Sequence, residues 1–360
     1  MGNTWGNNIK LSIFGESHGD AIGIIIDGLP SGIQLDLDEI KKEMDRRKPG
    51  KSNISTSRKE ADEVKILSGF FEGKTTGTPL CGIIENTNTI SKDYNKNIMR
   101  PGHADYAGFV KYNGFNDYRG GGHFSGRITA PLVFAGAVAK QILSKSGIAI
   151  GAHIKQVGDI SDCEFDRVNI NESLINQFKY KEFPTIDIEI GNKMKELIGN
   201  VKENLDSIGG QIECAIVGLN PGLGEPFFDS VESTISSIMF SIPAVKGIEF
   251  GAGFKFTNML GSQANDSIYI KNEKVLTYTN NNAGITGGIT NGMPIIFSLA
   301  IKPTPSIARP QNTIDVSKNE NIQTEITGRH DPCIVHRAVP VVESCAAIAI
   351  LDLMSLEKFL

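Results

Sequence analysis

The chain has 360 residues, of which 40% are hydrophobic and 21% are charged, as is ordinary for a globular protein. Its formal net charge of −5 excludes the basic field with which proteins bind nucleic acids or anionic membranes. The N-terminus has no basic, apolar leader, the most apolar stretches carry acidic residues, and the five cysteines form no C-x-x-C pair. We therefore expect no membrane span, reduced thiols and a cytoplasmic location.

Strands and helices are predicted in mixed order along the chain. Strands at 9–14 and 21–27 are joined by a turn at GESHG, and a helix follows at 35–47 with Asp36 as its N-cap. Further strands are expected at 64–70, 79–85, 148–157, 211–219 and 293–301, and further helices at 129–147, 192–206, 230–242 and 339–359. With no linker and no internal repeat, a single domain over residues 1–360 is expected.

The stretch GESHG at 15–19 matches the Gly-x-Ser-x-Gly pattern of a hydrolase nucleophile elbow, with Ser17 as the nucleophile. An elbow needs a strand before it and a helix directly after it. The segment that follows, AIGIIID, is rich in β-branched residues and has no helical period. Ser17 is therefore interpreted as a turn residue, and a serine hydrolase remains an alternative function.

Arginine is scarce in this chain and clustered. Only ten of the 36 basic residues are arginines, and seven of these lie in Gly- or Pro-rich stretches, as do five of the six histidines. Arginine has a planar fork of donors that matches phosphate and carboxylate oxygens, whereas lysine is a point charge. Each arginine alone could cap a turn or form a surface pair. The set together indicates an anion site, either catalytic or, as a second alternative, purely for binding.

Other glycine-rich stretches are less specific. GFFEGKT at 69–75 is one residue short of a phosphate-binding loop and is predicted to be a strand end and turn. In RGGGHFSGR, the glycines, Ser125, Arg127 and a helix start at Thr129 would make an anion cradle. GITGGITNG at 284–292 suits backbone contacts with a flat cofactor, or else forms a hairpin. His330, Cys333 and His336 lack a fourth ligand nearby, so no metal is expected.

Taken together, the motifs resemble those of the chorismate synthase family over residues 6 to about 345. They include GESHG, DRRKPG, VKILSGFFEGKTTGTP, RPGHADYAGFVKY, DYRGGGHFSGR, GLGEPFFD, NNAGITGGITNG, KPTPS and GRHDPC, in the family's order. The resemblance implies an α+β fold, a β-α-β sandwich in a single large domain, and a homotetramer. It implies an anti-1,4-elimination of phosphate from 5-enolpyruvylshikimate 3-phosphate, which gives chorismate with reduced FMN and no net redox change. A flavoprotein that consumes its reduced flavin is a third alternative.

The resemblance also implies roles for particular residues. His18 would lie near the departing phosphate, His103 near the flavin, and Asp331 would act with the flavin in removing a proton from the substrate. Substrate anions would be held by Arg46, Ser125, Arg127 and Arg329. The flavin would contact His123, Phe124, Ser125, Ala244, Gly287, Lys302, Pro303, Thr304, Pro305, Ser306 and Arg329, and NADPH, as a reductant of the flavin, would bind near Arg47. Departures from many relatives at His123, Phe124, Ile128, Asn53 and Pro243 bear on flavin contacts and nucleotide reduction more than on the elimination.

Overall fold

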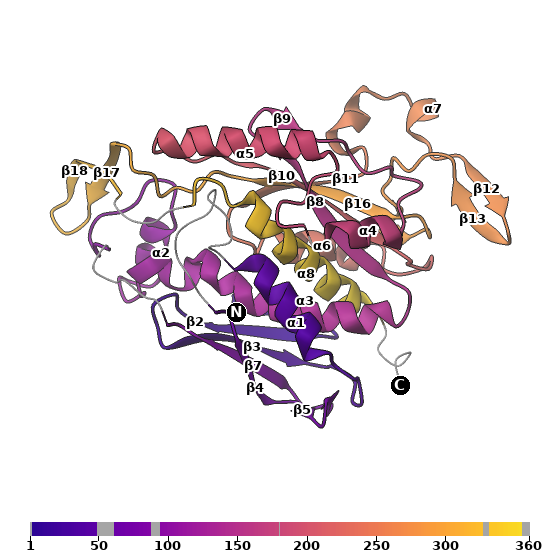
Figure 1. The fold of residues 1–360 in the computed structure, drawn as a ribbon, viewed down its shortest axis with the longest axis horizontal. Coiled ribbons are helices and arrows are strands. Elements are labelled where there is room, and N and C mark those ends of the chain that lie inside the picture. The colour runs from indigo at the N-terminus through magenta and orange to yellow at the C-terminus, as the bar shows by residue number, and fades with distance from the viewer. Residues whose placement is uncertain (1, 49–60, 88–93, 180, 327–330, 355–360) are drawn as a thin grey trace.

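Two five-stranded antiparallel sheets enclose a layer of helices (Figure 1). The computed structural model describes residues 2–48, 61–87, 94–179, 181–326 and 331–354. The first sheet has the order β1-β2-β3-β7-β4, with strands β1 (Thr4–Trp5), β2 (Lys10–Gly15), β3 (Ala21–Asp27), β4 (Val64–Ser68) and β7 (Leu80–Glu85). The second has the order β11-β16-β10-β8-β9, with strands β8 (Ala149–Val157), β9 (Ile160–Ser161), β10 (Gly210–Val217), β11 (Val245–Phe250) and β16 (Ile295–Ile301).

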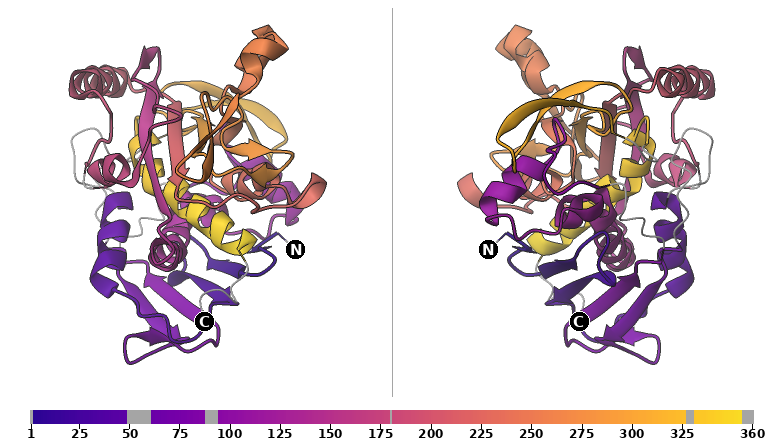
Figure 2. Two further views of the ribbon diagram at one scale, coloured as in Figure 1. Left: turned by 90° about the vertical axis from the view of Figure 1, so that its right-hand side faces the viewer. Right: turned by 90° about the vertical axis from the view of Figure 1, so that its left-hand side faces the viewer.

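The helix layer between the sheets consists of α1 (Leu37–Arg47), α3 (Thr129–Ser144) and α8 (Val335–Leu353), as the two side views show (Figure 2). Helix α6 (Val231–Met239) packs against α8, while α4 (Glu172–Phe178) and α5 (Ile188–Glu203) contact strands β8 and β9 of the second sheet. One hydrophobic core spans both sheets and the helices between them. The predicted α+β fold, a β-α-β sandwich in one domain, is confirmed.

Smaller elements decorate this sandwich. The short helices are α2 (Asp105–Lys111), α7 (Gly261–Ala264) and the 3₁₀ helices η2 (Arg119–Phe124), η3 (Gly126–Ile128), η4 (Phe227–Asp229) and η5 (Gly253–Asn258). Four hairpins join β5 (Phe70–Phe71) to β6 (Lys74–Thr75), β12 (Ile268–Lys271) to β13 (Lys274–Thr277), β14 (Ile285–Thr286) to β15 (Ile289–Thr290), and β17 (Gln311–Asp315) to β18 (Glu320–Thr324). GFFEGKT and GITGGITNG are therefore both hairpins. No helix in the described part of the chain is both long and apolar enough to cross a membrane.

Alternation of side chains explains the first sheet. Strand β3 pairs with β2 and β7 so that Ile22, Ile24 and Ile26 face the helix layer and are fully buried. On the opposite face, Lys10 pairs with Asp27 at the edge of the molecule. A one-residue slip would exchange the two faces, so the hydrophobic pattern fixes the register.

The two long central helices are apolar on nearly every side because other helices and both sheets cover them. Buried residues run along almost the whole of α3 and α8. The helices approach closely at Gly136, where an added Cβ would lie 2.1 Å from the Cβ of Ser344. Helix α8 begins at Val335, four residues before the predicted start, and contains Pro340. The first turns of α8 form one wall of the cavity described next.

Candidate active site

A cavity of about 700 Å³ opens where η2, η3, the end of α6 and the start of α8 come together. Its size lies within the range of small-molecule sites. Many of the residues that the sequence singled out line it: Arg47, His103, His123, Phe124, Ser125, Arg127, Ala244, Lys302, Thr304, Pro305, Ser306 and Asp331. These residues come from segments up to 284 positions apart (Arg47 to Asp331), so the fold gathers most of the predicted site into one hollow.

Five predicted residues are not among those that line the cavity. The guanidinium of Arg46 points elsewhere and pairs with Glu343 at 2.6 Å and Glu43 at 2.8 Å. Gly287 lies in the β14–β15 hairpin, and the next residue, Gly288, approaches Ser230 at the start of α6. The cavity lies at the other end of α6, where residues 240–246 line it. Pro303 packs against Gly209, although both of its neighbours face the cavity. His18 lies just behind the cavity wall, and Arg329 falls outside the described residues.

The glycines of η2 bring His18 and His103 to the same turn. Gly120, Gly121 and Gly122 have positive φ angles of 59°, 83° and 53°, which residues other than glycine rarely adopt. A Cβ on Gly120 would lie 2.5 Å from Nε2 of His18, and a Cβ on Gly121 would lie 3.2 Å from Nε2 of His103. Larger residues at Gly120 and Gly121 would displace the two imidazoles, so their close approach depends on these two glycines.

His103 is held by charged neighbours at the start of α2. Its Nδ1 lies 2.6 Å from an Asp105 carboxylate oxygen. Arg100 donates to both oxygens of that carboxylate, at 2.7 and 2.8 Å. Burial would raise the pKa of Asp105, but hydrogen bonds from Arg100 and His103 outweigh it and hold the pKa well below its usual range. Asp105 is therefore a carboxylate at neutral pH.

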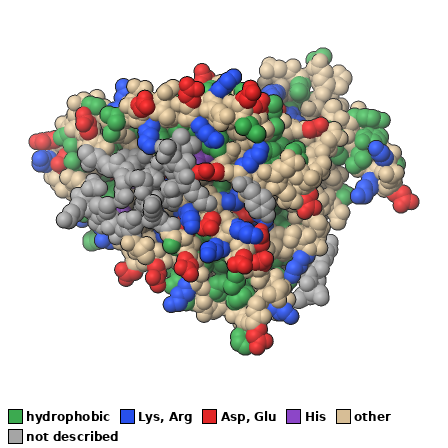
Figure 3. Space-filling view, viewed as in Figure 1, with side chains coloured by type: hydrophobic (Ala, Val, Ile, Leu, Met, Phe, Trp, Pro, Cys, Tyr) green, Lys and Arg blue, Asp and Glu red, His purple; other side chains and the backbone are tan. Residues whose placement is uncertain are grey.

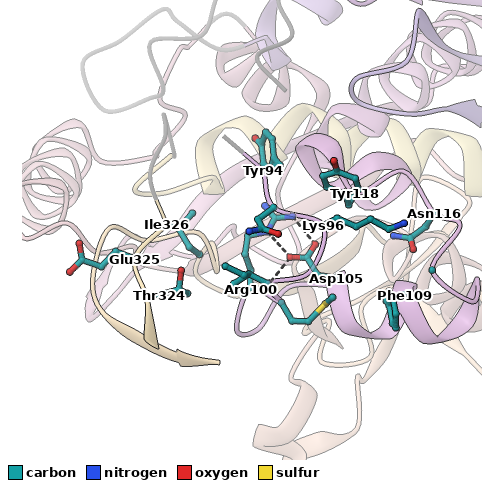
Figure 4. A pocket seen from close by; sticks show the side chains of 14 residues that line it. Tyr94, Lys96, Arg100, Asp105, Phe109, Asn116, Tyr118, Thr324, Glu325 and Ile326 are labelled. Carbon is teal, nitrogen blue, oxygen red and sulfur yellow. Dashed lines mark hydrogen bonds and ion pairs between the residues drawn. The ribbon is translucent and has the colours of Figure 1, made fainter. Parts of the chain in front are cut away.

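A smaller cavity of about 200 Å³ adjoins the first and shares Tyr94 and Arg100 with it. Figure 4 shows the Arg100–Asp105 pair in this second cavity, with Tyr94 above it and the side chains of Thr324 and Ile326 to its left. The guanidinium of Arg100 lies over the Tyr94 ring, 5.5 Å from its centroid. The pair thus forms part of the boundary between the two cavities.

Positive charge dominates the large cavity, in contrast to the chain's net charge of −5. Among the described residues that line it, one carboxylate, Asp331, faces six cationic side chains: Arg47, Arg100, Arg127, Lys246, Lys302 and Arg337. Burial, together with the charge of Lys246, lowers the pKa of Lys302. Such a concentration of cations is stable only with anions nearby, so the cavity is suited to a ligand with several negative charges.

Besides Asp105, which holds Arg100, two further carboxylates hold cations of the cavity wall. Asp62 is buried and bridges Arg47 and Arg127. Burial would raise the pKa of Asp62, but the two guanidinium groups outweigh it and lower the pKa. Asp331 pairs with Arg337, and its backbone oxygen accepts from the Thr304 hydroxyl at 2.9 Å. These contacts fix the orientation of the three guanidinium groups.

The rest of the cavity wall is apolar or backbone. Ile242, Val245, Ile334, Ala338 and Val341 form an apolar side. Polar groups of the wall are already hydrogen-bonded within the protein. The Ser125 hydroxyl caps η3 by accepting from the Arg127 amide, and the Ala244 carbonyl accepts from the Lys302 amide at 2.9 Å. A flat aromatic ring that carries an anionic tail fits such a combination of apolar surface, backbone and cations.

The hydrolase reading fails on geometry. Strand β3 begins at Ala21, two residues after GESHG, so no helix follows Ser17. The Ser17 hydroxyl is fully buried and has no hydrogen-bond partner among the residues that the structure describes. A nucleophilic serine needs a base within hydrogen-bond reach and access to substrate. The interpretation of Ser17 as a turn residue is confirmed.

No group of three potential metal ligands occurs within the described ranges. The His330–Cys333–His336 pattern cannot be assessed as a whole because His330 lies outside them. Burial raises the pKa of the Cys333 thiol to about 12 and lowers the pKa of His336 to about 4. At neutral pH these two side chains are therefore a thiol and a neutral imidazole. All five cysteines are free.

Sequence reasoning missed several residues of the site. Arg100 and Arg337 belong to the arginine clusters but received no role, and Lys246 lies in a stretch without a recognised motif. The only available signal for Asp105 was its place two residues after His103. Asp62 had no signal, because its role depends on two arginines that meet only in the folded protein.

Comparison with known proteins agrees with the motifs. The family model for chorismate synthase matches residues 9–355. Proteins named chorismate synthase from Thermococcus kodakarensis and Dehalococcoides mccartyi are 46% and 45% identical over 349 and 359 residues, covering 96% and 98% of this chain and 96% of each relative. One from Azobacteroides pseudotrichonymphae is 47% identical and covers 97% of this chain and 98% of the relative. A crystal structure of chorismate synthase matches with a TM-score of 0.75 at 28% identity, over 98% of this chain and 93% of that one.

Proposed function

The chain belongs to the chorismate synthase family, and from this we propose that it converts 5-enolpyruvylshikimate 3-phosphate into chorismate by anti-1,4-elimination of phosphate. The reaction leaves no net redox change, and it would classify the enzyme as a carbon–oxygen lyase acting on phosphates in aromatic amino acid biosynthesis. One observation carries the proposal: a cavity with six cationic side chains in a protein of net negative charge.

The charges of substrate and cavity are complementary. The substrate carries a phosphate and two carboxylates, and bringing these anions out of water is prohibitive without nearby cations. Hydrogen bonds to charged groups contribute about 1.5–3 kcal/mol each, so several are needed to hold such a ligand. Fixed donors also stabilise the charge that develops on a departing phosphate. The arginines and lysines of the wall meet both needs.

We assign the catalytic roles to His18, His103 and Asp331. His18, behind Gly120, would donate to the departing phosphate, and His103 would hold or deliver a proton on the cofactor side. Asp331, the one carboxylate among the described lining residues, is suited to accept a proton. Ser125 and Arg127 would bind substrate anions. Arg46 is left out of this group because its guanidinium does not line the cavity and instead pairs with Glu343 and Glu43. Arg329 stays a prediction outside the described residues.

Reduced FMN is the proposed cofactor. His123, Phe124 and Ser125 would hold it from one side, and Ala244, Lys302 and Thr304 to Ser306 from the other. When bound, the reduced flavin supplies an electron-rich ring that can lend electron density to the reacting substrate. A contact from Gly287 is not part of this proposal, because its hairpin packs at the opposite end of α6. Reduction of the flavin by NADPH near Arg47 stays a prediction, since Asn53 lies outside the described residues.

One anaerobic experiment tests the function. The protein is mixed with 5-enolpyruvylshikimate 3-phosphate and chemically reduced FMN, and phosphate, chorismate and flavin absorbance are followed together. We expect phosphate and chorismate in equal amounts over many turnovers, with the flavin still reduced at the end. Substrate retention without phosphate release would instead favour a binding protein, and flavin oxidation in step with product would favour a redox flavoprotein. Arg127→Met is the matched variant and should release phosphate far more slowly.

We further propose a cytoplasmic homotetramer. The five free cysteines support a reducing compartment. The β12–β13 hairpin projects from the body as an arm, and apolar side chains gather on it (Figure 3). Ile268, Ile270 and Val275 share one face of the arm and are 70%, 77% and 55% exposed. A lone two-stranded hairpin is marginally stable in water, and exposed apolar patches mark interaction sites, so the arm is suited to a second copy of the chain.

Replacing Ile270 by glutamate tests this assembly. Because Ile270 is already exposed in the single chain, the change should leave the monomer folded but place a charge in the subunit contact. Sedimentation should give four times the 38.9 kDa chain mass for the wild type and smaller species for the variant. Asn321→Glu, on the exposed β17–β18 hairpin, is the control and should remain tetrameric. A wild type that sediments as a monomer would contradict the proposal.

A further inference from the structure

Three residues within six positions, Arg100, His103 and Asp105, form a connected group at the edge of the proposed active site. His103 lines the cavity, with 16% of its side chain exposed. Its Nδ1 contacts Asp105 at 2.6 Å and also lies 3.1 Å from an Arg100 terminal nitrogen. Both contacts cannot be hydrogen bonds at once, because arginine only donates and a carboxylate only accepts. The position of the proton therefore has to be settled.

The short contact with Asp105 settles it. A carboxylate oxygen and an unprotonated ring nitrogen would repel each other at 2.6 Å, so a proton lies between them. The pKa of Asp105 is held well below its usual range by its hydrogen bonds, despite burial, so the proton is on Nδ1. Nδ1 thus donates to Asp105, and the nearby Arg100 nitrogen donates to the same carboxylate at 2.8 Å rather than to the ring. The other nitrogen, Nε2, approaches the cavity-lining glycine turn at Gly121.

Asp105 is itself held in place. Arg100 donates to it from Nε and from a terminal nitrogen, and the Arg100 amide donates at 3.1 Å. Ser306 and the Tyr94 ring contact the guanidinium from the other side. Lys302 donates to the Gly102 carbonyl at 2.9 Å, and Lys246 lies near Lys302. Lys96 and Glu325 line the smaller cavity with Asp105, and neither has a hydrogen bond to His103 among the described contacts. Asp105 is thus the carboxylate that balances positive charge on His103.

We propose that Asp105 is a positioning residue that fixes the ring orientation and the tautomer of His103, and that Arg100 positions Asp105. The inference rests on the proposed function and deepens it. With Nδ1–H bound to Asp105, Nε2 is the atom that exchanges a proton with a group in the cavity. When Nε2 releases its proton, the N–H electron pair stays on Nε2 and Asp105 remains ionised throughout. The carboxylate stabilises the protonated ring and excludes the tautomer with hydrogen on Nε2 alone.

Asp105→Asn tests the proposal. The shape is kept, but the charge is lost and the amide can donate to Nδ1, which favours the wrong tautomer. We expect kcat to fall about ten- to hundredfold, a loss typical of residues that orient a reacting group, with KM for substrate nearly unchanged. Activity should also begin to fall at a lower pH as the pH is raised, because the protonated His103 ring no longer has the Asp105 carboxylate beside it. Asp105→Glu should recover part of kcat, and Arg100→Lys should change it in the same direction as Asp105→Asn.

Nitrogen NMR of His103 gives a readout that does not need turnover. In the wild type the neutral ring should carry its hydrogen on Nδ1, and in Asp105→Asn on Nε2, with His103→Gln used to assign the signals. Asp206→Asn is the control, since it removes the carboxylate of an exposed aspartate–arginine pair, with Arg309 at 2.7 Å, that does not line the cavity. An unchanged tautomer and an unchanged pH profile in Asp105→Asn would overturn the proposal. If the wild type fails to release phosphate, the function is wrong, while the NMR result still decides the role of Asp105.

Discussion

Replacing His103 by alanine is expected to lower kcat by about 10²- to 10⁴-fold and to leave the affinity for substrate close to that of the wild type. The imidazole lines the cavity beside the glycine turn, and its ring is fixed by a carboxylate rather than exposed to solvent. It is therefore built to hold a proton at a defined atom. The cationic side chains that would bind the substrate anions are separate residues and remain in the variant.

Two measurements separate chemistry from binding. Single-turnover phosphate release under anaerobic conditions gives the rate of the chemical step, and calorimetric titration with 5-enolpyruvylshikimate 3-phosphate gives the affinity. His103→Gln keeps a polar side chain of similar reach, but its amide does not gain or lose a proton near neutral pH, so it should be as slow as the alanine variant. A raised KM with kcat unchanged would mean that His103 only binds substrate, which would contradict its proposed role.

Much of the fold could be predicted because its strands and long helices carry clear patterns. Strand β3 has the predicted bounds 21–27, and Asp36 caps α1 by accepting from the amides of Asp38 and Glu39. Strand β11 was missed because VKGIEF mixes charged and apolar residues at the edge of its sheet. The start of α8 at Val335 was missed because a proline such as Pro340 is favoured in the first turn of a helix and disfavoured further inside it. In the folded protein, burial between the sheets keeps the helix continuous through Pro340. Tertiary packing decides such cases.

The site could be predicted in composition but not in detail. Arginine clustering identified most of the segments that meet at the cavity, since anion recognition needs that side chain. It could not distinguish Arg46 from Arg47, because neighbouring residues on a helix point about 100° apart. Arg47 faces the cavity and Asp62, while Arg46 faces Glu343 on α8. Which of the two reaches a ligand depends on how α1 lies against α8, and the local sequence does not contain that information.

The same Arg46 leads to the largest expected effect on stability. Glu343 lies in the middle of α8, is only 2% exposed, and pairs with Arg46 on α1 and with Lys140 on α3 at 2.7 Å. Its carboxylate also accepts from the Ala152 amide on β8. Glu43 completes the cluster by pairing with the same two cations, so two acids balance two bases. Removing one acid leaves an uncompensated buried positive charge.

Replacing Glu343 by alanine should therefore lower the free energy of unfolding by about 3–5 kcal/mol, the usual cost of breaking a buried pair from one side. Urea unfolding at pH 7 measures this loss. Glu39→Gln is the control, because Glu39 pairs with Lys42 and Lys179 near the surface and should cost less than about 1 kcal/mol. Adding Lys140→Met to Glu343→Gln restores charge balance and should recover part of the loss, as a double-mutant cycle would detect. Strict additivity of the two changes would contradict a coupled cluster.

The cluster also predicts a dependence on pH. Burial raises the pKa of Glu343, but Arg46 and Lys140 outweigh it and lower the pKa to about 2, below its ordinary value of 4.5. A carboxyl group with a depressed pKa in the folded state contributes its full stability above the unfolded value and loses it as pH falls toward 2. The free energy of unfolding should thus decline less steeply between pH 4.5 and 2 in Glu343→Gln than in the wild type. Equal slopes would show that Glu343 does not stabilise the fold as a carboxylate. Because the cluster joins α1 to α8 outside the cavity, kcat of the folded variant at pH 7 should stay close to that of the wild type.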